Sequence, residues 1–230
     1  MTTKPKQLII IGGGTSIKPC YLPLLKDKLG GYLTIGTNYS YKFIKSTFQA
    51  CVDSTFYNAQ YKDLLGLGFV VSGAPSMTAV APNTLKLKPS STFDQTLKKG
   101  VYKANLTGIY TLSLACFLMN GPNDQIFLLG YDYGVKEPPK KGIIAQTHFY
   151  QSQLAHRGIG KINYYITKDR ADKDFDVFKG ATAKIYNVSL ESNINSFEKI
   201  SYERFFELLD KEEYNQEELL EYVKSRFNSI

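Results

Sequence analysis

The sequence predicts an α/β fold, namely a mostly parallel, doubly wound sheet with helices on both faces and an irregular surface insertion. Residues 7–11 form a continuous β-branched run that stops at a glycine-rich turn. Residues 125–130 form a second apolar run, which is followed closely by Asp132. Unbroken apolar runs of this length are typical of strands buried on both faces of a parallel sheet. The first 53 residues alternate strand-like, turn-like and helix-like segments, as βαβ units do.

The other elements follow from similar signals. Short apolar segments bounded by Gly, Asn or Asp predict further strands at residues 32–38, 50–53, 67–71 and 183–189. Residues 39–47 fit a short helix. A longer helix is expected to start at Thr107, which can cap it, and its apolar residues up to Met119 cover most of its circumference. Such a helix must be buried.

We expect residues 1–230 to form a single domain, because no segment reads as an interdomain linker. Residues 72–103 are rich in Gly, Pro, Ser and Thr and predict an irregular insertion. Residues 135–160 show no period and are interpreted as a loop or lid over a site. Residues 201–228 form an amphipathic helical tail.

Composition excludes several classes of protein. The three cysteines are isolated and odd in number, so neither a disulfide framework nor a structural zinc site is implied. The apolar run near the first residue is far shorter than the ~20 residues of a membrane span. We therefore expect a cytoplasmic protein without a membrane span or a resident metal. The sequence predicts no oligomeric state.

The net charge of +7 is unevenly distributed. From Glu198 onward nine acidic residues face five basic ones, so the preceding part carries +11. A basic body attracts nucleic acid, acidic lipid or phosphorylated small molecules. It is equally typical of a solvated, lysine-rich surface.

Candidate binding residues come from the carboxyl ends of the predicted strands, where open parallel sheets bind ligands. They are the turn Gly12, Gly13, Gly14, Thr15 and Ser16, together with Asn38, Asp53, Asp132, Tyr133 and the strand-end run Asn187, Val188 and Ser189. Glycines let backbone amides approach a phosphate closely. The turn is not a dinucleotide fingerprint, because Ile17 stands where the third glycine would fall, and no Gly-Lys-Ser/Thr follows as in a P-loop. A tight turn without a ligand is the alternative.

The candidate catalytic residues are His148, His156 and Arg157, which fall in the loop at residues 135–160. An imidazole can accept a proton from a sugar hydroxyl, while Arg157 neutralises a leaving phosphate. The alternative is that both histidines are ordinary surface residues without a catalytic role. Asp53 and Asp132 are interpreted as ligands of a divalent cation, as partners of a ribose or as helix caps.

Taken in order, these segments resemble a known group of enzymes. Residues 9–17, 34–38, 52–53 and 126–132 are similar in order and spacing to a Rossmann-like, MptE-like group, and residues 185–192 and 197–200 resemble its closing strand and tail. The group joins small bacterial sialyltransferases, the motility-associated-factor glycosyltransferases that modify flagellin, and archaeal 6-hydroxymethylpterin diphosphokinases. Gly13 and Asp53 depart from the sialyltransferase branch, where asparagines occur, and this puts CMP-sialic acid as the donor in doubt.

The resemblance implies a nucleotide-activated donor held by the glycine turn, Asn38 and the region of Asp53. It implies that a histidine of the later loop, His156 ahead of His148, acts as general base. It also implies that tyrosines assist the leaving phosphate, with Tyr131, Tyr133 and Tyr150 as the matches.

Three functions are therefore expected, in order. The first is a sialyltransferase-like glycosyltransferase that needs no metal and acts on a small-molecule or glycan acceptor. The second is a diphosphokinase that uses Mg²⁺ and ATP, with Asp53 and Asp132 as metal ligands. The third is a non-catalytic protein that binds nucleic acid or another polyanion.

Overall fold

The fold is an α/β sandwich built on one wholly parallel sheet, which confirms the predicted fold class. The computed structural model describes residues 5–103, 106–133, 149, 168–209 and 214–230. The strands of the main sheet are β1 (Gln7–Ile11), β2 (Leu33–Thr37), β3 (Phe48–Cys51), β4 (Val70–Ser72), β5 (Thr84–Lys86), β8 (Gln125–Leu129), β9 (Lys184–Asn187) and β10 (Glu198–Lys199). A second, small sheet pairs β6 (Pro89–Ser90) with β7 (Val101–Tyr102).

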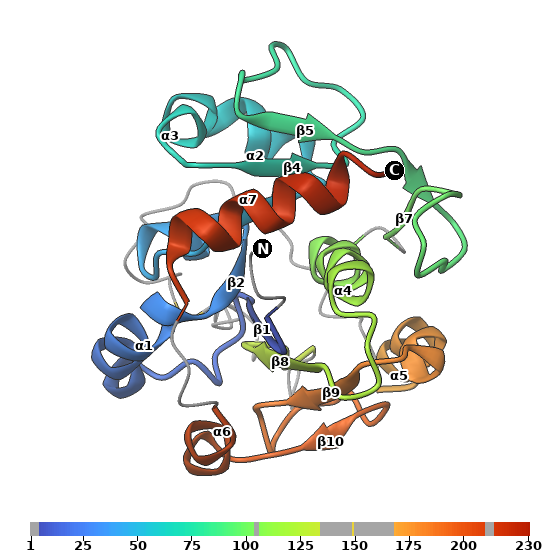
Figure 1. Cartoon of the computed structure of the whole chain (residues 1–230). Helices are drawn as coiled ribbons and strands as arrows, with labels where there is room; N and C mark the ends of the chain where they lie inside the picture. The colour runs from blue at the N-terminus through green and yellow to red at the C-terminus, as the bar shows by residue number, and fades with distance from the viewer. Residues whose placement is uncertain (1–4, 104–105, 134–148, 150–167, 210–213) are drawn as a thin grey trace, which may run out of the picture.

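Helices cover both faces of the sheet (Figure 1). They are α1 (Leu22–Lys28), α2 (Ser54–Ala59), α3 (Tyr61–Leu65), α4 (Thr107–Leu118), α5 (Lys168–Asp176), α6 (Tyr202–Leu208) and α7 (Gln216–Phe227). Short 3₁₀ turns also occur, at η1 (Pro19–Tyr21), η2 (Leu29–Gly31), η3 (Asn38–Lys42) and η4 (Val177–Gly180). Helices α4, α5 and α7 share one apolar cluster with the sheet, and α1 and α6 share a cluster on the opposite face.

The strand order β10-β9-β8-β1-β2-β3-β4-β5 places β1 near the middle of the sheet. From β1 the chain builds outward to β5, and it then returns to the other side of β1 and builds outward again from β8. The order of strands therefore reverses between β1 and β8. In doubly wound folds this switch point opens a crevice at the carboxyl ends of the two strands.

Strand β1 is buried on both faces, as its sequence predicts. Leu8 and Ile10 belong to the cluster under α4, whereas Ile9 and Ile11 belong to the cluster under α1. Alternate residues of a strand point to opposite faces, so a strand covered on both sides needs an apolar residue at every position. This explains the unbroken run from Leu8 to Ile11.

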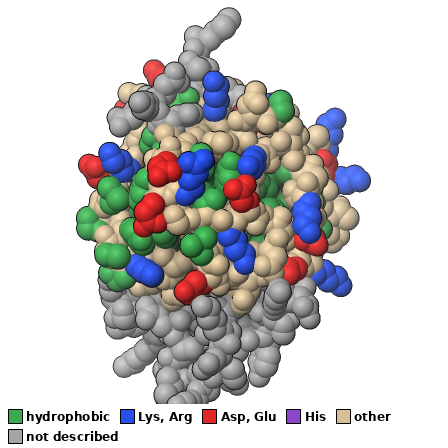
Figure 2. Space-filling view, turned by 90° about the horizontal axis from the view of Figure 1, so that it is seen from below, with side chains coloured by type: hydrophobic (Ala, Val, Ile, Leu, Met, Phe, Trp, Pro, Cys, Tyr) green, Lys and Arg blue, Asp and Glu red, His purple; other side chains and the backbone are tan. Residues whose placement is uncertain are grey.

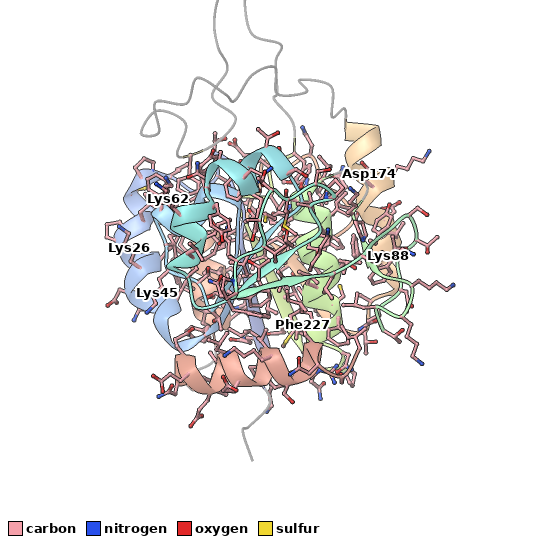
Figure 3. The ribbon with its side chains drawn as sticks, turned by 90° about the horizontal axis from the view of Figure 1, so that it is seen from above. Lys26, Lys45, Lys62, Lys88, Asp174 and Phe227 are labelled. Carbon is pink, nitrogen blue, oxygen red and sulfur yellow. The ribbon has the colours of Figure 1, made fainter. Side chains whose placement is uncertain are left out.

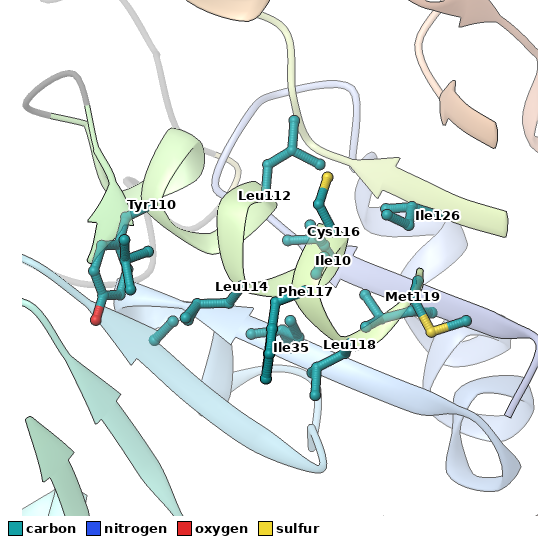
Figure 4. Packing of buried hydrophobic residues seen from close by; sticks show 14 of the residues in the cluster. Ile10, Ile35, Tyr110, Leu112, Leu114, Cys116, Phe117, Leu118, Met119 and Ile126 are labelled. Carbon is teal, nitrogen blue, oxygen red and sulfur yellow. The ribbon is translucent and has the colours of Figure 1, made fainter. Parts of the chain in front are cut away.

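Helix α4 lies against β1, β2 and β3, and every residue from Ile109 to Leu118 is buried. Figure 4 shows Leu114 and Phe117 near Ile35, with Ile126 across the helix. At its carboxyl end α4 meets α7, whose Phe227 stacks on Phe117 with ring centroids 5.6 Å apart. Phe227 lies between α7 and the sheet (Figure 3). The prediction that this helix is buried is confirmed.

The carboxyl end of α4 has hydrogen-bond partners for its last carbonyls. Gln95 Nε2 donates to the carbonyl of Cys116 at 2.9 Å, Arg226 Nη2 to that of Phe117 at 3.1 Å and Tyr222 Oη to that of Leu118 at 2.9 Å. These carbonyls have no partner within the helix. Arg226 also places a positive charge at the negative end of the helix dipole.

Several predicted elements differ from the observed ones. Strand β3 begins two residues before the predicted segment, because Phe48 and Gln49 pair with β2. Strand β4 begins at Val70, because Asn83 Nδ2 donates to the carbonyls of Leu64 and Leu67 and holds that segment in a turn. The helix expected at residues 39–47 is the shorter η3. Residues 72–103 contain β5, β6 and β7, and β10 and helices α1, α2, α3 and α5 were not predicted.

The tail at residues 201–228 contains two helices, α6 and α7, as an amphipathic region predicts. The three cysteines are free, with Cys51 and Cys116 buried and Cys20 exposed. Within the described residues, no helix has the length and apolar character needed to cross a membrane.

Replacing Leu114 with Ala is expected to lower the free energy of unfolding by about 2–5 kcal/mol, because the side chain is fully buried and leaves a cavity. Leu24→Ala is the matched control, since Leu24 is 39% exposed, and it should change stability by under about 1 kcal/mol. Urea denaturation followed by circular dichroism measures both. Equal losses in the two variants would contradict the described packing of α4.

Candidate functional site

The structure brings the sequence-predicted binding residues to one edge of the sheet. The glycine turn follows β1, Asn38 follows β2, Asp53 follows β3 and Asp132 follows β8. Because all of these strands are parallel, their carboxyl ends lie at the same edge. Thr37 Oγ1 at the end of β2 donates to the carbonyl of Ile11 at 3.1 Å, which ties the ends of β1 and β2 together.

The glycine turn packs directly against the end of β8. The amide of Gly12 donates to the carbonyl of Leu129 at 2.7 Å, and that of Gly14 to the carbonyl of Gly130 at 2.8 Å. A Cβ on Gly12 would lie 2.6 Å from the Gly130 oxygen. The tight-turn interpretation therefore accounts for Gly12 and Gly14. Within the described residues, the amides of Gly13 and Thr15 make no hydrogen bond, so they are the ones that can meet a ligand.

Asp132 closes this turn rather than capping a helix. One carboxylate oxygen, Oδ2, accepts from the amide of Ser16 at 2.8 Å and from Thr15 Oγ1 at 3.3 Å. The other oxygen, Oδ1, is buried and has no hydrogen-bond partner within the described residues. Asp132 thus joins the segments after β8 and β1 across the switch point.

Asn38 is held in an unusual backbone conformation, with φ of +48°. Asparagine tolerates this left-handed region better than most residues. Its backbone carbonyl accepts from Gln49 Nε2 at 2.6 Å, and its side-chain Oδ1 accepts from Thr107 Oγ1 at 3.3 Å. The second contact connects the end of β2 to the first residue of α4.

Asp53 acts as a helix cap, which was one of its predicted roles. Its Oδ1 accepts from the amides of Thr55 at 2.7 Å and Phe56 at 3.2 Å, the first-turn amides of α2. The side chain is exposed. A role for Asp53 toward a ribose or a metal remains a prediction.

The amino end of α4 is a feature that the sequence analysis missed. Thr107 was expected to cap this helix, but the capping position is occupied by Leu106, and among the described residues no side chain caps the first-turn amides. A helix that runs opposite to the strands begins at their carboxyl edge. The uncapped end therefore lies beside the glycine turn, next to Asn38. Gly108 in its first turn is the sequence signal that could have revealed a close approach here.

Two tyrosines after β8 surround this helix end. Tyr131 Oη donates to the carbonyl of Gly108 at 3.0 Å, and a Cβ on Gly108 would meet the hydroxyl of Tyr133. Burial, reinforced by Tyr133 and Cys116, raises the pKa of Tyr131, and burial with the charge of Asp174 raises the pKa of Tyr133. Both hydroxyls are therefore protonated at neutral pH. Tyr131 already uses its proton, whereas Tyr133 can donate to a ligand at the helix end.

His148, His156, Arg157 and Tyr150 lie outside the described residues. Their predicted catalytic roles stay predictions. Among the described residues, no group of three or more His, Cys, Asp and Glu side chains is arranged to hold a metal ion.

A cleft of about 320 Å³ lies at the opposite, amino edge of the sheet. It is lined by Lys26, Leu29, Gly30, Phe43, Lys45 and Gln216. Gly30 precedes β2 and Lys26 lies near the end of α1, and Figure 3 shows Lys26 and Lys45 on the same side of the molecule. The sequence-predicted binding residues are not among those that line it.

Acidic and basic side chains are interspersed on the face next to α6 and β10 (Figure 2). Lys184 pairs with Glu198 at 2.9 Å, and Arg204 pairs with Glu207 at 2.9 Å. Paired charges of both signs on one surface do not make the single-sign patch that a polyanion requires. This face gives no support to the nucleic-acid interpretation.

The fold is similar to that of a known glycosyltransferase. The structure of a MAf glycosyltransferase from Magnetospirillum magneticum AMB-1 superposes with a TM-score of 0.59 and 13% sequence identity. The match covers 98% of this chain and 38% of that one, so this chain spans less than two fifths of its length. No protein-family model and no curated protein sequence matches the chain. The likeness establishes a shared Rossmann-like α/β fold.

Gly14→Ala is expected to destabilise the protein by roughly 1–3 kcal/mol, because the added Cβ would lie 2.5 Å from Asp132 Oδ2 and 2.6 Å from the Gly130 carbonyl. Gly30→Ala is the control, since no atom lies within 4 Å of its added Cβ. Thermal denaturation compares the two variants. A neutral Gly14→Ala would show that the turn does not cross β8 as closely as described.

Asp53→Ala is expected to cost about 1 kcal/mol of stability through loss of the α2 cap. Asp53→Asn should cost little, because its amide oxygen still accepts from the Thr55 and Phe56 amides. Urea denaturation of the two variants measures the difference. If both variants lost the same stability, the negative charge rather than the cap would be the important property of Asp53.

Proposed function

We propose that this protein is a glycosyltransferase that moves a sugar from a nucleotide-activated donor to an acceptor hydroxyl. The observation that carries this proposal is the uncapped amino end of α4 at the switch point, beside the turn after β1. The likeness in fold to a MAf glycosyltransferase supports the same class of reaction. Sialyltransferase-like specificity is the finer form of the proposal, and it rests on the sequence resemblance.

The donor phosphates would bind at the end of α4. A helix of this length presents unsatisfied N–H groups and about half a positive charge at its amino end. Phosphate groups commonly occupy such positions. The amides of Gly13 and Thr15, the Asn38 side chain and the Tyr133 hydroxyl would complete the anion site. As the glycosidic bond breaks, these donors would stabilise the charge that develops on the leaving phosphate.

The acceptor would be activated by a general base. His156 is the proposed base, His148 is the second candidate, and Arg157 would add a positive charge near the leaving group. A neutral imidazole has a pKa close to neutral pH, which suits removal of a hydroxyl proton during attack. No metal is required in this scheme.

A diphosphokinase remains the alternative proposal, and it would need Mg²⁺ and ATP. Asp53 and Asp132 do not suit a shared ion, because β3 and β8 are three inter-strand spacings apart, about 14 Å. Mg²⁺ requires its oxygen ligands at about 2.1 Å. Each carboxylate also accepts hydrogen bonds from its own neighbours. Metal ligands for that reaction would have to include other residues.

Asn38→Asp tests the proposed phosphate site. The new carboxylate can still accept a hydrogen bond from Thr107 Oγ1, and its negative charge interacts favourably with the positive end of the α4 dipole. The fold should therefore keep its stability. It would, however, repel a bound diphosphate, and we expect nucleotide affinity to fall by at least about tenfold. Saturation-transfer NMR and calorimetry with UDP, CMP, GDP, ATP and their nucleotide sugars measure this.

Asn215→Asp is the matched control. Asn215 caps α7, and its neighbour Tyr214 donates from its amide to the carbonyl of Gly31 at the amino edge of the sheet. The same change of charge at that helix should leave nucleotide affinity unaltered. The proposal fails if the wild-type protein binds no nucleotide, or if both variants weaken binding equally.

A further inference from the structure

Four buried oxygen atoms at the carboxyl edge of the sheet lack a hydrogen-bond partner within the described residues. They are Ser16 Oγ, Asp132 Oδ1, Asn187 Oδ1 and Tyr202 Oη. Buried polar atoms in folded proteins are nearly always hydrogen-bonded, so each exception needs an explanation. Asn187 ends β9, and the other three residues follow β1, β8 and β10, which places all four at the carboxyl ends of neighbouring strands around the switch point.

Ser16 and Asp132 are direct neighbours. The Ser16 amide donates to Asp132 Oδ2 at 2.8 Å, which leaves the Ser16 hydroxyl and Asp132 Oδ1 without partners. Asn187 lies beside them, because its Nδ2 donates to the carbonyl of Tyr131 at 3.1 Å. A hydroxyl, a carboxylate oxygen and an amide oxygen thus gather where β8 and β9 end.

Tyr202 reaches the same region from the start of α6. It is 7% exposed, and its ring stacks on that of Tyr21 with centroids 4.1 Å apart and planes 15° apart. Tyr21 belongs to the segment after β1, although β8 and β9 separate β1 from β10 in the sheet. The aromatic pair therefore spans this end of the sheet. Burial raises the pKa of Tyr202, and the charge of Asp132 raises it further.

We propose that Ser16, Asp132 and Tyr202 form a subsite that binds the hydroxyl groups of a sugar. A sugar hydroxyl can donate to Asp132 Oδ1 and accept from the hydroxyls of Ser16 and Tyr202. The negative charge of Asp132 disfavours an anionic group at this position, and a single carboxylate is a poor site for a divalent cation. A neutral, hydroxyl-rich ring fits all three side chains. The proposal deepens the glycosyltransferase function proposed above and rests on it for the reaction.

The hydroxyls could belong to the donor's sugar or to the acceptor, and Tyr202→Phe separates these sources. The substitution keeps the stack on Tyr21 and removes only the hydroxyl without a partner. Loss of one hydrogen bond should weaken sugar binding about fivefold to tenfold. If the donor's sugar is bound, nucleotide sugars lose this affinity while the nucleotides do not. If the acceptor is bound, a panel of methyl hexopyranosides loses it. Calorimetry and saturation-transfer NMR give both readouts.

Tyr222→Phe is the control, because the hydroxyl of Tyr222 donates to the carbonyl of Leu118 far from this edge. It should leave all affinities unchanged, and thermal denaturation should show Tyr202→Phe to be as stable as the wild type. The subsite is overturned if no saccharide binds the wild type, or if Tyr202→Phe binds every probe as the wild type does. If the wild type binds nucleotides and Tyr202→Phe does not change the affinity for any probe, the subsite is excluded and the proposed donor site stands. If saccharides bind in a way that depends on Tyr202 but no nucleotide binds, the proposed donor site is excluded and the subsite stands.

Discussion

Helix α4 is buried from Ile109 to Leu118, and within the described residues only its carboxyl end is satisfied by side chains. At its carboxyl end, side chains of Gln95, Tyr222 and Arg226 reach in from other elements and occupy the last carbonyls. At its amino end no side chain of the described part of the chain caps the first-turn amides. Those amides carry the positive end of the helix dipole. One end of α4 is therefore anchored by side chains of the surrounding elements, whereas its other end forms part of the proposed anion site.

The surrounding residues are arranged around that open end. Asn38 accepts a left-handed backbone and contacts Thr107, and Tyr133, also with positive φ at +43°, lies against Gly108. Backbone conformations of this kind carry a cost that the neighbouring structure must offset. Both strained residues lie where strands β2 and β8 end, on either side of β1. The same geometry positions a donor amide and a protonated hydroxyl beside the helix.

Much of the fold could be predicted from the sequence because burial on both faces leaves a strong local signal. Strands β1 and β8 are apolar at nearly every position, and the apolar residues of helix α4 cover most of its circumference. Strand β3 was placed two residues too late because its buried Gln49 is polar; the Gln49 side chain donates to the carbonyl of Asn38, which follows the neighbouring strand β2. Strand β10 is two residues long and has no pattern to detect.

The candidate site could be predicted only in part, for a similar reason. Its position followed from the rule that parallel sheets bind ligands at their carboxyl edge. The roles of single residues depend on partners far along the chain, such as Asp132 with Ser16 or Tyr202 with Tyr21. The glycines illustrate the difficulty, because Gly12 and Gly14 are required by the carbonyl of Gly130 whether or not a phosphate binds.

The central place of β1 also constrains how the chain can assemble. One edge of β1 pairs with β2, which follows within about 25 residues, but its other edge pairs with β8, more than a hundred residues later. During synthesis an apolar strand with an open edge must therefore wait for its second neighbour. Long-range parallel pairing of this kind slows folding and exposes the intermediate to aggregation. We expect the growing polypeptide to depend on chaperones until β8 has left the ribosome.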